Sequence, residues 1–513
     1  MKNNKGFAIS TIIYSMVILF LMLMLLILLM LSTRKVILDK QKTGIINSIN
    51  GTEEDAKLYK ETLLNGAYPE LYKGLVPVTI DNDGTVKKAD TTKMWYSYEN
   101  KIWANAVILF GDDIYNAGDT IKEEEIKQYY VWIPRYRYKL WNVNSELSEG
   151  AEQPINIVFE NKKEVRSTGS NNGEWLTHPA FISFNSNGIW VGKFETSYNE
   201  DSYTNSSTFL TKNANYSQAT QGSNIIIKPN VRSLSNKNVS QFYELGINTN
   251  KNLNSHMMKN TEWGAAYLTY SVYGNCTSSS CEEVYPNNVN TGYLTETAKF
   301  TGQWEYGATI TGCSASSTSA SVSSNQSSCA AGYAWNGKNN KSSTNGNISG
   351  IYDMSGGDYE YMMFSIMDSN GNPISGQNST RNSGFNGTFG CPTCNSDTSG
   401  LTSLTNGVAF PTDKRYYDLY TPNSTELNDG TWYVYTNSYL GDAMKEMSIS
   451  KSNSSSGSKT LWFNDYAYYP TTMNPLIYRG GAYNSRDTSG ITSFGWATGI
   501  LSAGVSFRIV LAP

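Results

Sequence analysis

Cysteine is the residue whose spacing in this sequence most directly suggests chemistry. The six cysteines form three local pairs, Cys276/Cys281, Cys313/Cys329 and Cys391/Cys394. An even number of closely spaced cysteines is typical of disulfides in an oxidising compartment. Cys276, Cys281, Cys391 and Cys394 could instead bind zinc, and the Cys391/Cys394 pair could be redox-active. We favour three short-range disulfides, because the spacing is loose for zinc and no thioredoxin-like βαβ pattern surrounds the pair.

Histidines and carboxylates offer fewer possibilities. His178 and His256 are the only two histidines, which leaves little for histidine-based metal sites or acid–base catalysis. Asp353, Asp358 and Glu360 are the carboxylates best placed for a calcium site, or alternatively for a buried hydrogen-bond network. We find no glycine-rich phosphate loop, nucleophile elbow or zinc-helix motif in the sequence.

The composition of the chain favours a cell-surface protein without a nucleic-acid partner. Only 16% of the 513 residues are charged, against about 25% in an average soluble domain. Polarity comes instead from Asn, Ser, Thr and 36 Tyr. Four of the 40 basic residues lie in 1–35, and the rest of the chain, with 44 acidic residues, is acidic. It therefore lacks the basic surface that DNA or RNA would require.

The elements that must position these groups begin with an uncharged segment from Phe7 to Thr33. At 1.5 Å per residue such a helix can span a bilayer core of about 30 Å, which predicts a transmembrane helix over 7–33 in contact with membrane lipid. Basic residues after the segment slightly favour a C-terminal domain on the inner side of the membrane. Because long domains cross membranes largely regardless of charge, we predict a single-pass cell-membrane protein whose C-terminal domain is extracellular.

The residues before this segment resemble the leader of type IV prepilins. The resemblance rests on Lys5-Gly6-Phe7 followed by a long apolar stretch, and it implies cleavage between Gly6 and Phe7 by a prepilin peptidase. It also implies pilin-like subunits as partners. Pilins usually carry Glu at the fifth mature position, where this chain has Thr11, so assembly as a major pilin is not favoured.

After the apolar segment, the pattern predicts a helical stalk over 34–70 and a small β-rich domain over 71–170. Val76 to Ile80, an Asp83-Gly84 turn and Val86 predict a hairpin. A helical interruption is expected over 122–129. The serine-rich segments 314–328 and 450–459 predict loops.

Several motifs in 171–513 together resemble the formylglycine-generating enzyme (sulfatase-modifying factor) family. They are HPAF (178–181), GIWVGKFETS (188–197), NTEWGAAYL (260–268), NISGIYDMSGGDYEY (347–361), RGGAY (479–483) and SFRIV (506–510). The resemblance implies a C-type-lectin-like fold. Trp190, Trp263 and Tyr352 are expected in its core, with ligand binding as the alternative. Gly357 stands where the family has a liganding Asn, which favours the hydrogen-bond network over calcium.

The catalytic chemistry of that family is not expected here. Its enzymes bind copper through two cysteines after the Gly-Gly pair, and the matching positions carry Ser485 and Gly490. Neither is a soft thiolate ligand. We therefore predict that the protein is not an enzyme and needs no cofactor, with calcium as the one exception considered.

Members of the fold that lack the cysteines commonly bind ligands through variable loops. The candidate surface here is 484–503, with Arg486, Asp487, Phe494 and Trp496 as ligand-binding residues. An ordinary loop with Trp496 packed inward is the alternative. Trp462, Tyr466, Tyr468 and Tyr469 could extend the same surface or belong to the core.

These inferences give an α+β fold class with five segments: a leader (1–6), a transmembrane helix (7–33), a helical stalk (34–70), a β-rich domain (71–170) and a lectin-like domain (171–513). The predicted function is that of a membrane-anchored bacterial surface protein. Its non-catalytic head would bind an extracellular glycan or protein in adhesion or recognition. The alternative is a pilin-like structural subunit of a surface filament or secretion pseudopilus.

Overall fold

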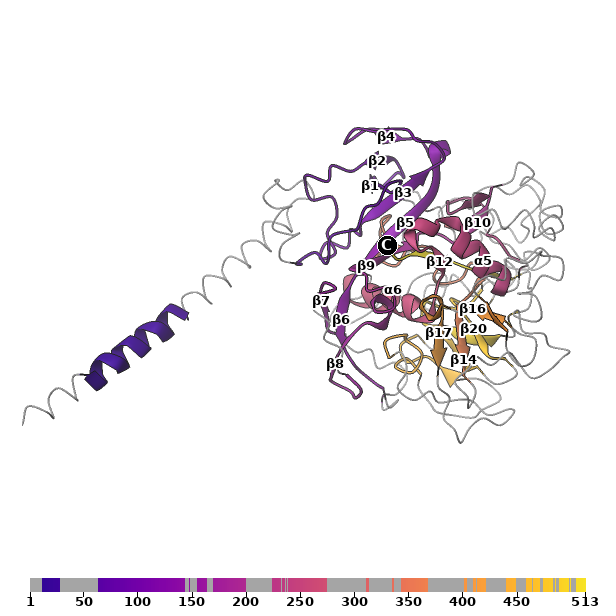
Figure 1. Ribbon diagram of the computed structural model, residues 1–513. Coiled ribbons are helices and arrows are strands. Elements are labelled where there is room, and N and C mark those ends of the chain that lie inside the picture. Colours follow the sequence, from indigo (N-terminus) through magenta and orange to yellow (C-terminus); the bar gives the residue numbers. More distant parts are fainter. Residues whose placement is uncertain are drawn as a thin grey trace, which may run out of the picture. The chain divides into compact units, whose positions relative to one another are not determined.

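The structure is a computed structural model of the 513-residue chain (Figure 1). It describes residues 12–27, 63–143, 147, 155–163, 169–199, 224–231, 233–235, 237, 239–274, 311–312, 335, 343–367, 401–403, 409–411, 413–420, 440–448, 458–463, 465–470, 474–482, 485, 489–497, 499 and 504–513. By internal contacts the chain forms two compact units. One comprises Met1–Leu58 with Thr92–Met94, and the other comprises Tyr59–Thr91 with Trp95–Pro513.

The N-terminal region corrects the predicted fold class. Residues 12–27 are helical. Among the described residues, none of the helices combines the length and apolar character needed to cross a membrane. The predicted transmembrane helix over 7–33 and the single-pass membrane localisation are therefore wrong. The predicted helical stalk over 34–70 is wrong as well, since its described part, 63–70, contains turns and no helix.

The described part of the chain is instead rich in β-structure, with three α-helices: 12–27, α5 (Val239–Thr249) and α6 (Asn260–Tyr273). Its 3-10 turns are η1 (Glu123–Glu125), η2 (Pro179–Phe181), η4 (Lys251–Leu253) and η8 (Lys414–Tyr416). The strands up to α5 are β1 (Val76–Ile80), β2 (Val86–Lys88), β3 (Asn105–Leu109), β4 (Thr120–Ile121), β5 (Ile126–Pro134), β6 (Tyr136–Lys139), β7 (Ile157–Phe159), β8 (Trp175–Thr177), β9 (Gly188–Gly192), β10 (Ser197–Tyr198) and β11 (Ile225–Ile226). The later strands are β12 (His256–Met257), β13 (Tyr359–Tyr361), β14 (Phe364–Ile366), β15 (Leu401–Ser403), β16 (Ala409–Pro411), β17 (Asp418–Tyr420), β18 (Ser458–Lys459), β19 (Tyr466–Ala467), β20 (Leu476–Arg479), β21 (Phe494–Ala497), β22 (Val505–Ser506) and β23 (Ile509–Leu511).

The largest sheet has the order β12-β23-β9-β5-β3-β1-β2-β4. It combines strands from 71–170 with strands from 171–513, so the two predicted domains share one sheet. The predicted hairpin is confirmed, because β1 pairs with β2 in antiparallel register and the Gly84 amide donates to the Asp81 carbonyl at 2.8 Å. The C-terminal strand β23 lies between β12 and β9 in this sheet.

The middle of this sheet is buried on both faces because its strands are continuous runs of aromatic and β-branched residues. All residues of β5 from Gln128 to Pro134 are buried, as is the whole of β9. Gly188 is required where the two strands meet, since a Cβ there would lie 2.4 Å from the Trp132 ring. The expected core positions of Trp190, Trp263 and Tyr352 are confirmed by their complete burial.

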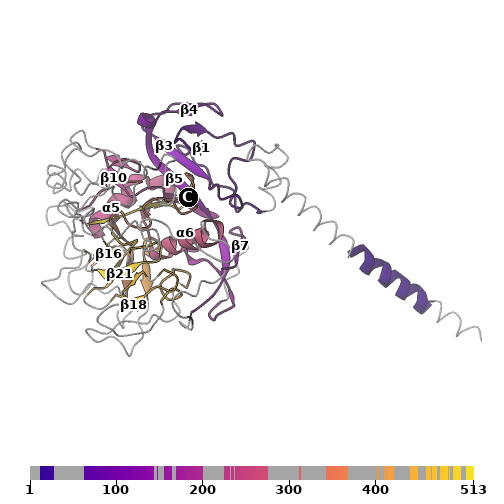
Figure 2. The same cartoon turned by 180° about the vertical axis from the view of Figure 1, so that it is seen from behind.

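A second sheet has the order β18-β19-β21-β20-β13-β22. In Figures 1 and 2, α6 lies between the large sheet and the strands β20 and β21. Hydrogen bonds join α6 to both sides: the Tyr136 hydroxyl donates to the Ala265 carbonyl at 2.8 Å, and the Trp263 indole donates to the Ile491 carbonyl at 2.8 Å. The helix is therefore buried over most of its length and fixes the second sheet in place.

Candidate functional site

The three carboxylates proposed for calcium are each engaged by protein groups. Glu360, on β13, forms a two-point ion pair with Arg508, whose Nε lies 3.0 Å from Glu360 Oε2. Asp353 accepts from the Gly312 amide at 2.7 Å, and Asp358 accepts from the Ser233 hydroxyl at 2.8 Å. Among the described residues, no group of three or more His, Cys, Asp or Glu side chains is arranged to hold a metal ion.

Glu195 completes this cluster from the segment after β9. Its carboxylate accepts from the Asp358 amide at 2.8 Å. Burial raises the pKa of Glu195 well above its usual value, and the neighbouring Asp358 and Asp353 carboxylates add to the shift. A Cβ at Gly357 would lie 2.3 Å from Glu195 Oε1, so Glu195 occupies the space beside the glycine. The geometry is that of a buried hydrogen-bond network rather than of an open cation site.

The cysteines of the three predicted disulfides all lie outside the described residues. The predicted pairs are Cys276–Cys281, Cys313–Cys329 and Cys391–Cys394. The part of the chain that the structure describes contains no cysteine. The structure therefore does not confirm a bond between Cys313 and Cys329 or within the other two pairs, and all three disulfides stay predictions.

The two positions that correspond to the copper-binding cysteines lie at the start and end of 485–490. The Ser485 hydroxyl is 2.6 Å from the Tyr359 hydroxyl and accepts from the Ala482 amide at 3.1 Å. At Gly490 a Cβ would lie 2.1 Å from Asp465 Oδ2. Asp465 thus fills the space that a side chain at 490 would need.

The predicted ligand-binding residues separate into three kinds. Phe494 is completely buried, with its ring 5.3 Å from the Arg479 guanidinium and 5.2 Å from the Tyr469 ring centroid, so it belongs to the core. Trp496 is half-buried on β21, opposite Ile477 of β20. Arg486 and Asp487 lie outside the described residues, as do Gly6 and Phe7 of the predicted leader cleavage site.

A set of half-buried tyrosines occupies the side of the second sheet that faces away from Arg479 and Phe494. We call Tyr359, Tyr466, Tyr468 and Tyr478 the tyrosine face. The register places Arg479 opposite Phe494 and Tyr478 opposite Gly495, so Tyr478 points to the other side of the sheet from Phe494. A Cβ at Gly495 would lie 2.6 Å from the Tyr478 ring, so the glycine lets this ring lie across β21.

The rings of the tyrosine face are in contact in pairs. Tyr466 and Tyr468 stack with centroids 4.0 Å apart, and Tyr359 and Tyr478 lie 4.3 Å apart. Burial raises the pKa of Tyr359, Tyr466 and Tyr478, so these phenols stay neutral at physiological pH. Lys459, paired with Tyr466 at the sheet edge, adds an exposed cation. The surface is therefore aromatic and rich in hydroxyl groups.

The opposite side of β20 is held by a buried polar network. Arg479 donates through Nε to Asn260 Oδ1 at 2.8 Å and through Nη1 to the Thr492 carbonyl at 3.3 Å. Asn260 in turn donates to Asp442 Oδ2 at 3.0 Å. These bonds connect β20 to the first residue of α6, so the strand that carries Tyr478 is fixed to the core.

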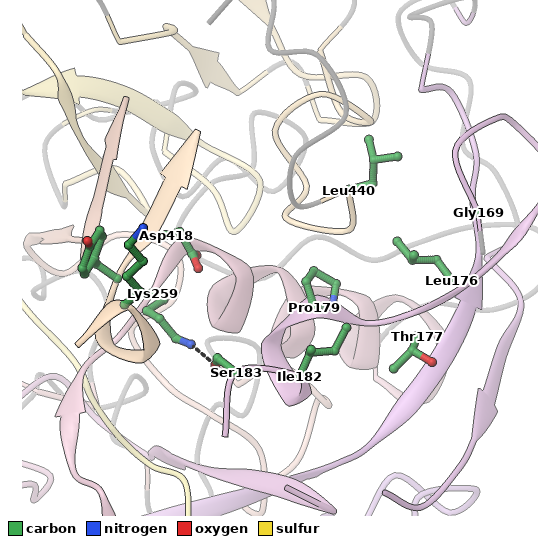
Figure 3. Close-up of a pocket in the computed structure, with 11 residues that line it drawn as sticks. Gly169, Leu176, Thr177, Pro179, Ile182, Ser183, Lys259, Asp418 and Leu440 are labelled. Atoms are coloured by element: carbon green, nitrogen blue, oxygen red, sulfur yellow. Dashed lines mark hydrogen bonds between the residues drawn. The ribbon is translucent and has the colours of Figure 1, made fainter. Parts of the chain in front are cut away.

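A separate pocket of about 460 Å³ lies near the start of α6 (Figure 3). We call it the Lys259 pocket. Its lining residues are Gly169, Leu176, Thr177, Pro179, Ile182, Ser183, Lys259, Lys414, Tyr417, Asp418 and Leu440. The Lys259 ammonium donates to the Ser183 hydroxyl at 2.7 Å. Burial raises the pKa of Asp418 to about 6, although the charge of Lys259 opposes the shift.

Sequence reasoning pointed to part of the tyrosine face and missed the Lys259 pocket. Tyr466 and Tyr468 were candidates for a binding surface, whereas Trp462 and Tyr469, named with them, are buried. Tyr359 belongs to the GDYEY motif, and its alternation with Glu360 was the signal that places it on the other side of the sheet. Lys259 and Asp418 come from distant segments and carry no common spacing signal.

A comparison with models of known protein families finds no match for this chain, and no curated protein matches it either.

Proposed function

We propose that this chain is a non-catalytic recognition protein whose tyrosine face binds a hydroxyl-rich ligand, in particular a glycan. The observation that carries the proposal is the grouping of Tyr359, Tyr466, Tyr468 and Tyr478 as half-buried rings on one side of a sheet. Tyrosine offers a large rigid apolar surface at low entropic cost, together with a hydroxyl group for hydrogen bonds.

The chemistry of the surface favours a neutral ligand with both apolar and hydroxyl groups. The phenols of Tyr359, Tyr466 and Tyr478 are neutral, and Ser485, beside Tyr359, adds another hydroxyl group. Sugar rings present apolar C–H faces and hydroxyl edges, which match stacked rings and their polar tips. A strongly anionic ligand would find Lys459 as the one cation among the described strand residues of this side.

The absence of catalysis is supported by the positions equivalent to the copper ligands. Ser485 supplies a hydroxyl that is paired with Tyr359, and the space beside Gly490 is filled by Asp465. Neither side chain is a thiolate that could hold copper. The resemblance to the sulfatase-modifying factor family would then concern the scaffold of a C-type-lectin-like fold and not its reaction.

A glycan array probed with the purified full-length chain tests the proposal, followed by titration calorimetry with the best ligand. Tyr468→Ala removes a half-buried ring outside the core, and we expect it to weaken binding by about tenfold, the effect of losing a well-packed aromatic contact. Tyr72→Ala is the matched control, because Tyr72 is an exposed tyrosine of the chain before β1. The proposal fails if no glycan binds, or if both variants bind as well as the unmodified chain.

A further inference from the structure

The Lys259 pocket has a polar end and an apolar end. In Figure 3, Lys259, Ser183 and Asp418 lie on one side, whereas Leu176 and Leu440 lie on the other, with Pro179 and Ile182 between them. A volume of about 460 Å³ falls within the range of about 300–1,000 Å³ that is typical of small-molecule sites. The pocket is therefore large enough for a small amphipathic molecule.

The cations of the polar end differ in how they are held. Lys259 is 1% exposed and is fixed by Ser183 and by Glu262, whose Oε1 lies 3.3 Å from the ammonium. His256 shares the same Glu262 oxygen at 2.9 Å, so one carboxylate serves two basic groups. Lys414, from η8, is exposed and forms no ion pair within the described ranges. The pocket thus has an anchored cation inside and an uncompensated cation at its rim.

Asp418 places an acid beside these cations. The residue is 2% exposed, and its Oδ2 accepts from the Thr261 amide at 2.8 Å. Asp418 starts β17, which pairs with β14 in parallel register, so the position of the carboxylate is set by the sheet. Lys259 and Asp418 lie on one side of the cavity and Lys414 also lines it, so the pocket presents charges of both signs rather than of one.

The apolar end is made by side chains of separate elements. Leu176 comes from β8, Pro179 from η2 and Leu440 from the segment before Gly441. Ile182 is 44% exposed, which leaves an apolar side chain at the mouth of the cavity. A ligand group that covers these side chains would remove apolar surface from water, which favours binding.

We propose that the Lys259 pocket binds a free α-amino acid with an apolar side chain. The ligand carboxylate lies at Lys259 and Lys414, its ammonium lies at Asp418, and its side chain lies against Leu176, Pro179 and Leu440. Each part of the pocket then meets a group of matching chemistry. A fatty acid of similar size would place its carboxylate, with no ammonium, beside the Asp418 carboxylate. An apolar amine would leave Lys414 without an anion.

Titration calorimetry of the full chain with L-leucine and L-methionine tests this proposal. We expect saturable binding of at least one of them. The matched probes are 4-methylpentanoate, which lacks the ammonium, 3-methylbutylamine, which lacks the carboxylate, and glycine, which lacks the side chain. Each should bind at least about tenfold more weakly, because a buried charged group loses its partner or the apolar wall loses its cover.

Two variants assign the effect to the pocket. Lys414→Gln changes an exposed residue, and we expect it to weaken amino-acid binding several-fold, while Lys163→Gln, at another exposed lysine, leaves it unchanged. Asp418→Asn should lower the affinity for leucine while leaving that for 4-methylpentanoate unchanged or higher. Tyr468→Ala, at the tyrosine face, should not affect the affinity for leucine. The proposal is overturned if neither amino acid binds, if 4-methylpentanoate binds as well as leucine, or if Lys414→Gln has no effect.

Discussion

Glu446→Gln is expected to stabilise the protein more at pH 8 than at pH 6. Glu446 is completely buried near β6, and its Oε1 accepts from the Gly441 amide and, at 3.3 Å, from the Tyr138 hydroxyl. Its Oε2 has no hydrogen-bond partner among the described residues. Burial raises the pKa of Glu446 to about 8, and the charge of Asp442 adds to the shift. The folded chain therefore holds this carboxyl in its neutral form at pH 6.

The sign and size of the effect follow from proton linkage. In the unfolded chain the pKa of Glu446 returns to 4.5. Between the two pKa values the folded state keeps a proton that the unfolded state has released, so the free energy of unfolding falls as the pH rises. With pKa values of about 4.5 and 8, this loss amounts to about 2 kcal/mol between pH 6 and pH 8. Glutamine has the shape of the neutral acid and does not titrate, so the variant avoids the loss.

Urea denaturation followed by tryptophan fluorescence measures the free energy of unfolding for both proteins at both pH values. The difference between Glu446→Gln and the unmodified chain should grow by about 2 kcal/mol from pH 6 to pH 8. Glu124→Gln, at an exposed glutamate of η1, is the control for a change of charge alone. An equal difference at the two pH values would mean that Glu446 is not held neutral by the fold, and the argument from burial would be refuted.

Three further predictions concern the packing at Gly490, the buried Glu360–Arg508 ion pair and the tyrosine face. Gly490→Ala should lower the free energy of unfolding by about 1–3 kcal/mol, because its Cβ would collide with Asp465, whereas Gly504→Ala, with nothing within 4 Å of a Cβ, should not; urea denaturation compares them. Glu360→Ala should cost about 3–5 kcal/mol, since it leaves the buried Arg508 without its anion; Asp81→Ala, which breaks the exposed pair with Lys87, should cost much less in the same assay. Ligand binding at the tyrosine face should stay constant from pH 6 to pH 9, because burial raises the pKa of Tyr359, Tyr466 and Tyr478; a calorimetric affinity that changes several-fold across this range would contradict that.

Local patterns predicted the elements that depend on neighbours in sequence. The β1–β2 hairpin follows from its turn residues and the apolar run before them. The helical interruption expected over 122–129 is only the 3-10 turn η1, after which Ile126 already starts β5. Pairing of β5 with both β3 and β9 stabilises the strand, and such long-range partners outweigh the local pattern that predicted helix up to Tyr129.

The candidate site depends on register and on distant contacts, which the sequence does not specify. Phe494 and Trp496 looked like exposed aromatics in a loop, but both belong to β21, where the pairing of Phe494 with Arg479 directs its ring into the core. Tyr478 is directed the other way by the same register. Lys259 and Asp418 lie in one pocket only because β17 and the start of α6 are brought together, with the Thr261 amide bound to the Asp418 carboxylate.

Both proposed binding sites are attached to one buried support. Lys259 directly precedes Asn260, which accepts from Arg479, and Arg479 directly follows Tyr478 of the tyrosine face. Each side-chain nitrogen of Arg479 and Asn260 has a hydrogen-bond partner, so this support is fully paired inside the core. A fully paired buried network rigidifies the groups around it. Because affinity without covalent chemistry depends on groups that are already in position before the ligand arrives, this rigidity suits a binding protein.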